Sequence, residues 1–211
     1  MRKLVVQSFM SLDGVVQAPG APDEDREGGF EQGGWLIPHF DDDFLQFVTD
    51  STQRAGALLL GRKTYDTFAA SWPLRDDDDP VAAVLNRIPK YVASRTLASA
   101  DWNNSTIIND DVAGEVATLK QQEGGEIQVH GSGDLVQTLL KHDLIDEFQL
   151  YTVPVLVGSG KRLFGGGTVP AGLKLVSTAT TGAGITFNTY QRHGDFGIGA
   201  YGPELERLSN A

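Results

Sequence analysis

The feature that most constrains the fold of this chain is a short apolar strand that leads directly into a helix. This strand-to-helix unit occurs more than once in the sequence. Residues 57–60 are Ala-Leu-Leu-Leu and run through Gly61 into an amphipathic segment. Residues 126–130 run through two glycines into 134–142, where apolar residues recur at helical spacing. Such alternation is typical of a mostly parallel sheet flanked by helices. Strands are expected over residues 3–10, 57–60, 90–94, 105–109, 126–130, 147–157, 172–181 and 184–192.

The C-terminal part departs from this alternation. Two runs of alternating apolar and polar residues, 172–181 and 184–192, flank a Gly-Ala-Gly turn, which is typical of a β-hairpin. The sequence therefore predicts an α/β fold with a mostly parallel sheet of about eight strands, an antiparallel C-terminal hairpin and about four helices. We expect one domain over residues 1–192 and a C-terminal tail over 193–211. Helices are expected from Asp41, after Gly61, over 111–122 and over 134–142, and a further short helix is favoured over 81–87.

Charge and composition exclude several classes of function. The chain carries 17 Lys and Arg against 28 Asp and Glu, and its net charge of −11 disfavours nucleic acid and anionic membranes as partners. It has no cysteine for disulfide or thiolate chemistry, and the spacing of its 4 histidines fits no metal template. No apolar run is long enough to cross a membrane, and the N-terminus lacks the pattern of a signal peptide. We expect a cytoplasmic protein that binds no metal.

Three loops follow predicted parallel strands, and ligands bind at that edge of an open α/β sheet. The first has a glycine, two cations and a hydroxyl at a helix start, which suits phosphate oxygens. The second sets a hydroxyl beside a guanidinium, which suits a phosphate monoester such as the 2′-phosphate of NADPH. The third has two glycines at a helix start, a weak dinucleotide signal. The three loops comprise Gly61, Arg62, Lys63 and Thr64; Ser94 and Arg95; and Gly131, Ser132, Gly133, Asp134 and Leu135.

Each loop also has a plainer interpretation, because a tight turn with solvated cations, a surface arginine and an ordinary strand-to-helix turn produce the same patterns. A further candidate is Asp13, which follows the first strand at the same edge of the sheet. Its carboxylate is suited to bind an amino-substituted ring or to hold a water, whereas an Asp-Gly pair at Asp13 and Gly14 is equally typical of a turn.

The loop motifs together resemble a known family. LLLGRKTYDTF, KYVASRTL and VHGSGDLVQTLL stand in the order and spacing of dihydrofolate reductases. SLDG near the start and PVLVGSGKRLF are similar to one branch of that family, the proteins related to the reductase (C-terminal) domain of bacterial riboflavin biosynthesis. The resemblance covers residues 2–192 and implies a three-layer sandwich around an eight-stranded sheet.

The resemblance also implies a cofactor and roles for particular residues. Members bind NADPH and reduce a pteridine or a ribosylamino-pyrimidine. Carried over by motif, Gly61 to Thr64 would hold phosphate, Ser94 and Arg95 the 2′-phosphate, and Gly131 to Leu135 the pyrophosphate. Asp13 would lie near the nicotinamide and the substrate, where it, or alternatively Asp43, would orient the substrate or relay a proton. Gly14 and Trp35 are further candidates for contact with the substrate. Asp43 best matches the helix carboxylate of dihydrofolate reductases, although it lies farther from Pro38 than in that pattern.

Two functional hypotheses follow. The first is an NADPH-dependent reductase of a small heterocyclic substrate, in which the chain orients the nicotinamide and excludes water. The alternative is a non-catalytic nucleotide-binding module of the same fold. A homodimer is expected in either case, because the terminal hairpin leaves an unpaired edge strand that a second chain would cover.

Overall fold

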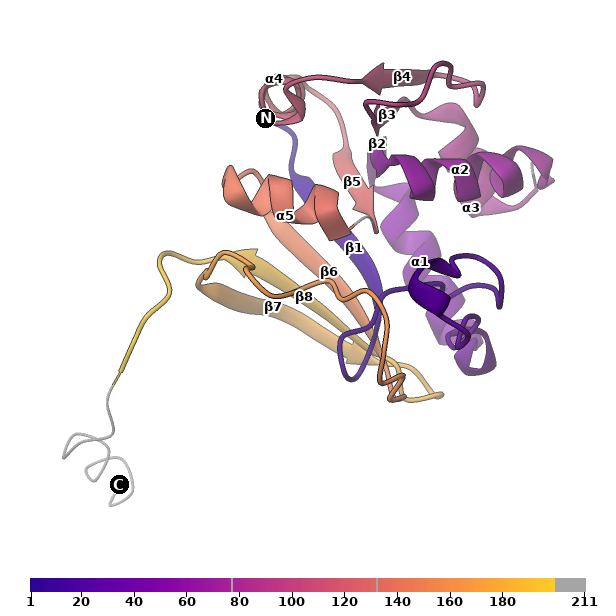
Figure 1. The fold of residues 1–211 in the computed structure, drawn as a ribbon, viewed down its shortest axis with the longest axis vertical. Helices are drawn as coiled ribbons and strands as arrows, with labels where there is room; N and C mark the ends of the chain where they lie inside the picture. Colours follow the sequence, from indigo (N-terminus) through magenta and orange to yellow (C-terminus); the bar gives the residue numbers. More distant parts are fainter. Residues whose placement is uncertain (77, 132, 200–211) are drawn as a thin grey trace.

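Parallel pairing organises the sheet from one edge to beyond its centre. The computed structural model describes residues 1–76, 78–131 and 133–199. The strand order is β4-β3-β2-β5-β1-β6-β8-β7 (Figure 1). Neighbours from β4 to β6 are parallel, whereas β8 pairs antiparallel with both β6 and β7. The strands are β1 (Leu4–Ser11), β2 (Ala55–Gly61), β3 (Lys90–Ala93), β4 (Ser105–Ile108), β5 (Glu126–His130), β6 (Glu147–Val153), β7 (Leu173–Thr180) and β8 (Thr186–Arg192).

Helices cover both faces of the sheet. Side chains alternate along β1, so Leu4 and Val6 join one core whereas Phe9 joins another on the opposite face. The first core contains α4 and α5, and the opposite face is covered by α1, α2 and α3. The predicted three-layer α/β fold with an antiparallel C-terminal hairpin is therefore confirmed. The helices are α1 (Asp42–Gln53), α2 (Arg62–Ser71), α3 (Pro80–Arg87), α4 (Val112–Gln121) and α5 (Gly133–Lys141).

The structure departs from the predicted bounds at the end of β6 and confirms the short helix favoured over 81–87. β6 ends at Val153, because Pro154 has no N–H to donate to the neighbouring strand. A fifth helix, α3, covers the segment for which the sequence favours a short helix, and the Asp79 side chain caps it. No helix in the described residues is both long and apolar enough to cross a membrane.

The edge strand of the sheet and the C-terminal segment concern two further expectations, the homodimer and the C-terminal tail. β7 is an edge strand and exposes Leu173, Leu175 and Val176. The homodimer inferred from this edge stays a prediction. Residues 193–199 contain no helix or strand, and residues 200–211 of the expected tail lie outside the described residues.

A buried lysine fixes the segment that follows β3. Lys90 is fully buried, and its ammonium group donates to the carbonyls of Asn86 and Asn103, each at 2.9 Å. The same group lies 4.3 Å from the centre of the Trp102 ring, and Trp102 donates its backbone N–H to the Tyr65 hydroxyl. These contacts join α2, α3 and the segment 94–104, which begins with Ser94 and Arg95.

Lys90 gives the fold a pH dependence. Burial lowers its pKa to about 8 from an ordinary 10.5, so the unfolded chain binds more protons between these values and stability rises with pH. The free energy of unfolding of the wild type, relative to Lys90→Met, is expected to increase by on the order of 3 kcal/mol from neutral pH to pH 10.5. Urea unfolding of both proteins at a series of pH values measures the difference in their free energies of unfolding. The contributions of the other titrating groups are the same in both proteins and cancel in this difference. A difference that does not vary with pH would contradict the prediction.

Candidate functional site

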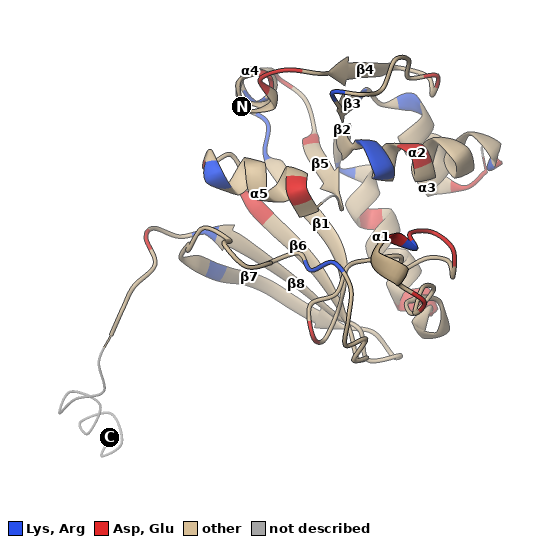
Figure 2. Ribbon diagram, viewed as in Figure 1, with Lys and Arg blue, Asp and Glu red and all other residues tan. Residues whose placement is uncertain are grey.

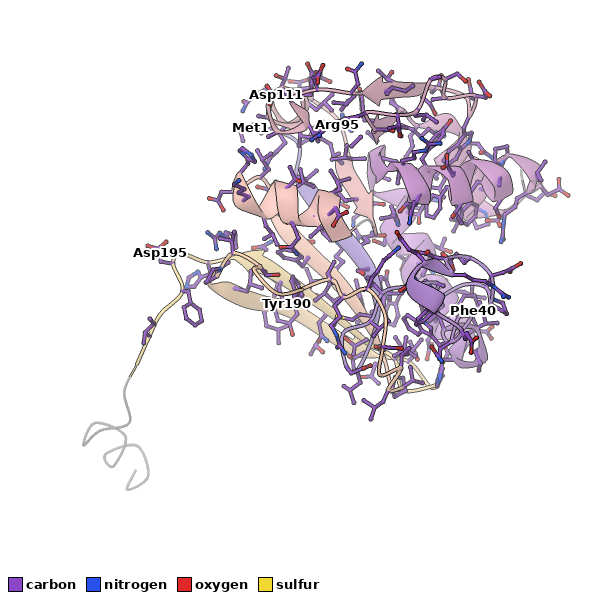
Figure 3. All side chains as sticks on the ribbon, in the orientation of Figure 1. Met1, Phe40, Arg95, Asp111, Tyr190 and Asp195 are labelled. Atoms are coloured by element: carbon purple, nitrogen blue, oxygen red, sulfur yellow. The ribbon has the colours of Figure 1, made fainter. Side chains whose placement is uncertain are left out.

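An open cleft lies where the parallel strands end. It has a volume of about 1730 Å³ and is lined by residues at the C-terminal ends of β1, β2, β3, β4 and β5. All three loops predicted to bind phosphate contribute to its lining. Arg95 lines the cleft near α4, whereas Phe40 lines it well away from Arg95 (Figure 3). Arg95 and Phe40 therefore lie in different parts of the cleft.

The start of α2 is built to receive an anion. Gly61 precedes the helix in an extended conformation and supplies no side-chain cap, whereas aspartates cap α1, α3 and α4. The positive end of the α2 dipole is thus left without an acidic cap. Figure 2 shows basic residues at the start of α2. One of them, Arg62, donates a hydrogen bond from Nη1 to Thr96 Oγ1 at 2.6 Å. Thr64 also lines the cleft.

Ser94 and Arg95 form the second loop. Ser94 Oγ accepts hydrogen bonds from the backbone N–H groups of Thr96 at 3.3 Å and Leu97 at 3.0 Å, which closes a turn after β3. The turn presents Arg95 on the cleft with an exposed side chain. None of the residues that the structure describes pairs with this guanidinium.

The third loop places backbone rather than side chains against the cleft. Gly131 has a φ of +63°, a conformation that favours glycine, and a Cβ there would lie 3.5 Å from Thr64 Oγ1. Gly133 begins α5, and Gly133, Asp134 and Leu135 all line the cleft. Ser132 lies outside the described residues. The first and third loops thus face each other across a narrow part of the cleft.

Asp13 binds a neighbouring loop. Its carboxylate accepts hydrogen bonds from the Ser11 hydroxyl at 2.7 Å and from the backbone N–H groups of Val157 at 3.0 Å and Gly158 at 2.9 Å. The Ser11 hydroxyl and the Val157 amide hold the pKa of Asp13 well below its usual range. Asp13 is not among the described residues that line the cleft, so its catalytic role stays a prediction.

The other expected substrate residues also make structural contacts. Gly14 has a φ of +86° and closes the turn after β1, and the Trp35 indole donates to the Gln17 carbonyl at 2.8 Å. Asp43 Oδ2 accepts from the backbone N–H of Gly182 in the β7–β8 turn at 3.2 Å. None of these three is among the described residues lining the cleft, and their substrate roles stay predictions.

The glycine-rich segment 18–34 is tied to both sides of the cleft by ion pairs. Glu27 pairs with Lys63 at the start of α2, and both Asp25 and Glu27 lie 2.5 Å from the ammonium group of Lys161. Although burial opposes the charge of Lys161, these hydrogen bonds raise its pKa to about 12. Lys63, expected to contact phosphate, is therefore paired with an acidic side chain in this structure.

Sequence reasoning missed the polar residues on the cleft floor. Gln7 and His130 line the cleft beside the apolar Phe9 and Phe68, and their strands pair in parallel. The sequence indicated them only by a glutamine within an apolar predicted strand and a histidine at the end of another predicted strand. Their common face becomes visible only once β1 is known to lie beside β5.

Comparison with known proteins identifies the family. The model of the RibD C-terminal domain matches residues 2–187, and the chain therefore belongs to the RibD C-terminal domain family. The uncharacterized protein YyaP of Bacillus subtilis (strain 168) is 31% identical over 196 residues, which cover 92% of this chain and 96% of YyaP.

Solved structures support the same fold. A protein from Shewanella sp. PV-4 assigned to riboflavin biosynthesis has a TM-score of 0.63 and 22% identity, over 90% of this chain and 99% of that one. Dihydrofolate reductase from Enterococcus faecalis, solved in complex with NADP(H), has a TM-score of 0.59 and 16% identity, over 91% of this chain and 97% of that one. The resemblance inferred from the loop motifs is confirmed.

The contacts of Asp13 lead to a prediction that separates a positioning role from a catalytic one. Asp13→Asn removes the charge and replaces one acceptor oxygen by an N–H donor, so the amides of Val157 and Gly158 are expected to exchange with deuterium faster than in the wild type. Hydrogen exchange measured by NMR reports on both amides. Asp43→Asn is the matched control, because its effect should be confined to the β7–β8 turn. Unchanged exchange with a turnover lower by about 10²–10⁴ would instead assign Asp13 to proton transfer.

Proposed function

We propose that this protein is an NADPH-dependent reductase of a small, planar, pteridine- or pyrimidine-like substrate. The observation that carries the proposal is that three loops, far apart in sequence, meet on one cleft. No described residue pairs with the guanidinium of Arg95, which lines this cleft. Ligands of open α/β folds bind at this edge of the sheet. The similarity to a dihydrofolate reductase solved with NADP(H) and membership of the RibD C-terminal domain family support the proposal.

The residues present fit a phosphorylated dinucleotide. The glycine-capped start of α2 and the backbone at Gly131 and Gly133 would bind the phosphates that join the two nucleosides. Arg95, which forms no ion pair with any described residue, would bind the 2′-phosphate beside Ser94. The bound cofactor would supply the hydride, and the chain would supply binding, orientation and exclusion of water.

The apolar end of the cleft fits a planar substrate ring. Phe9, Leu36, Phe40 and Phe68 line it, and Phe68 lies at ring-contact distance from His130. Such side chains stack on flat rings and exclude water. We infer a positioning role for Asp13, which holds the segment after β6 in place, and for Asp43, which holds the β7–β8 turn against α1.

Activity distinguishes the two functional hypotheses. A reductase is expected to consume NADPH in the presence of an accepted heterocycle, which the loss of nicotinamide absorbance measures. A non-catalytic nucleotide-binding module would bind NADPH with no turnover on any pteridine or pyrimidine offered.

Arg95 sets the expected cofactor preference. Arg95→Ala is expected to weaken NADPH binding roughly ten- to a hundredfold and to leave NADH binding nearly unchanged, because a hydrogen bond to a charged group contributes about 1.5–3 kcal/mol. Isothermal titration calorimetry with each cofactor measures the effect. Arg87→Ala is the matched control, since Arg87 is an exposed arginine of α3 that is not among the described residues lining the cleft. An equal loss for both cofactors would place Arg95 elsewhere on the ligand.

The backbone at Gly133 gives a second test. A Cβ there would meet its nearest neighbour, the Arg162 carbonyl, at 3.6 Å, which is ordinary van der Waals contact. Gly133→Val should therefore lower the melting temperature only modestly. We expect it to abolish binding of both NADPH and NADH, because the side chain obstructs the approach of the phosphates to the backbone. Retained binding of either cofactor, or gross unfolding, would contradict this assignment.

A further inference from the structure

Gln7 and His130 stand side by side on the floor of the cleft. β1 and β5 are parallel neighbours, and their register pairs Gln7 with His130. Paired residues of adjacent strands project to the same face of a sheet, and both residues line the cleft. Phe68 of α2 contacts the imidazole, with 5.7 Å between ring centres. The two polar side chains thus lie next to each other on the cleft floor, beside the ring of Phe68.

A hydrogen-bond chain fixes which atom Gln7 presents. Glu147, which accepts but does not donate, takes a hydrogen bond from Gln149 Nε2 at 2.8 Å. Gln149 Oε1 must then be the acceptor, and it receives Ser51 Oγ at 2.7 Å and Gln7 Nε2 at 3.0 Å. Arg54, which donates only, also approaches this oxygen, at 3.4 Å. The Nε2 of Gln7 is therefore committed to the protein, and no described residue donates to its Oε1.

The imidazole of His130 is neutral and incompletely bonded. Burial lowers its pKa to about 4, so at neutral pH it carries one N–H donor and one acceptor nitrogen. Its Nε2 atom is buried and has no hydrogen-bond partner among the described residues. Buried polar atoms in folded proteins are almost always bonded, and an unbonded one destabilises the free protein. Because His130 also lines the cleft, a ligand bound there would contact its imidazole.

We propose that Gln7 and His130 form a recognition pair for the lactam edge of an uncharged ring, the N–H donating to Gln7 Oε1 and the adjacent carbonyl accepting from the His130 imidazole. Both groups are neutral and offer an anion no positive charge, so they disfavour a carboxylate or a phosphate at this end of the cleft. The inference rests on the proposed function in placing a ring there. It adds the chemistry by which that ring is selected.

Two probes that differ in one N–H test the pair. The probes are 2-pyridone, the simplest ring with a lactam edge, and N-methyl-2-pyridone, in which that N–H is blocked. Titrations followed by NMR of the full chain without cofactor should show 2-pyridone binding at least about fivefold more tightly, because the blocked probe leaves Gln7 Oε1 unsatisfied. Gln7→Met should abolish this discrimination. Equal binding of the probes to the wild type, or no binding of 2-pyridone at millimolar concentration, overturns the proposal.

His130→Phe separates recognition from a structural role. Removing a buried, unbonded nitrogen while keeping a flat ring should raise the melting temperature by a few degrees and weaken 2-pyridone binding about three- to tenfold. A purely structural histidine would lower the melting temperature without changing the affinity, and that outcome contradicts the proposal. Gln128→Met, a buried glutamine on β5 outside the cleft lining, is the matched control and should leave the discrimination unchanged.

Cofactor binding is measured separately on the same variants. NADPH affinity of Gln7→Met and His130→Phe should stay within a few fold of the wild type, since neither residue belongs to the phosphate-binding loops. If a variant no longer discriminates between the two probes but still binds NADPH, the change therefore affects the recognition pair alone. If the wild type does not bind NADPH, the proposed function is refuted. The titration with 2-pyridone still tests the recognition pair in that case.

Discussion

The parallel register of β2, β5 and β1 is the constraint on which the rest of the structure depends. Parallel strands end at the same edge of a sheet, so the segments that follow them are brought together whatever their separation in sequence. Thr64 and Gly131 are thereby placed across a narrow gap. The antiparallel hairpin β7–β8 extends the sheet on the far side of β6 and takes no part in the cleft lining.

The same register places polar groups in an otherwise apolar interior. Gln7, Gln149 and Ser51 are buried, yet each is hydrogen-bonded to another, and Glu147 and Arg54 at the ends of this chain of bonds define which atoms donate. A network satisfied in this way is rigid, because turning one amide would set two acceptors against each other. The cleft floor therefore presents a defined pattern of atoms to any ligand that reaches it.

The sequence was informative where structure is local and uninformative where it depends on distant partners. Strand-to-helix junctions such as 57–64 carry their own glycine and apolar period, so the fold class and the three loops were predictable. The contacts of Asp13 and Asp43 were not, because their partners are Val157, Gly158 and Gly182, more than a hundred residues away. The same Asp-Gly pattern suits a turn, a catalytic carboxylate and a clamp between loops, and only tertiary pairing distinguishes them.

The pairing of Glu27 with Lys63 has a consequence for any anion that enters the cleft. Glu27 already occupies the position of a counter-ion at the start of α2, in a chain whose net charge is −11. A phosphate that binds Lys63 must exchange places with this carboxylate. Both side chains are largely exposed, and exposed ion pairs contribute little to stability, so this exchange changes the free energy little. For such an anion, the segment 18–34 would be a tethered competitor, present at a fixed local concentration that dilution does not change.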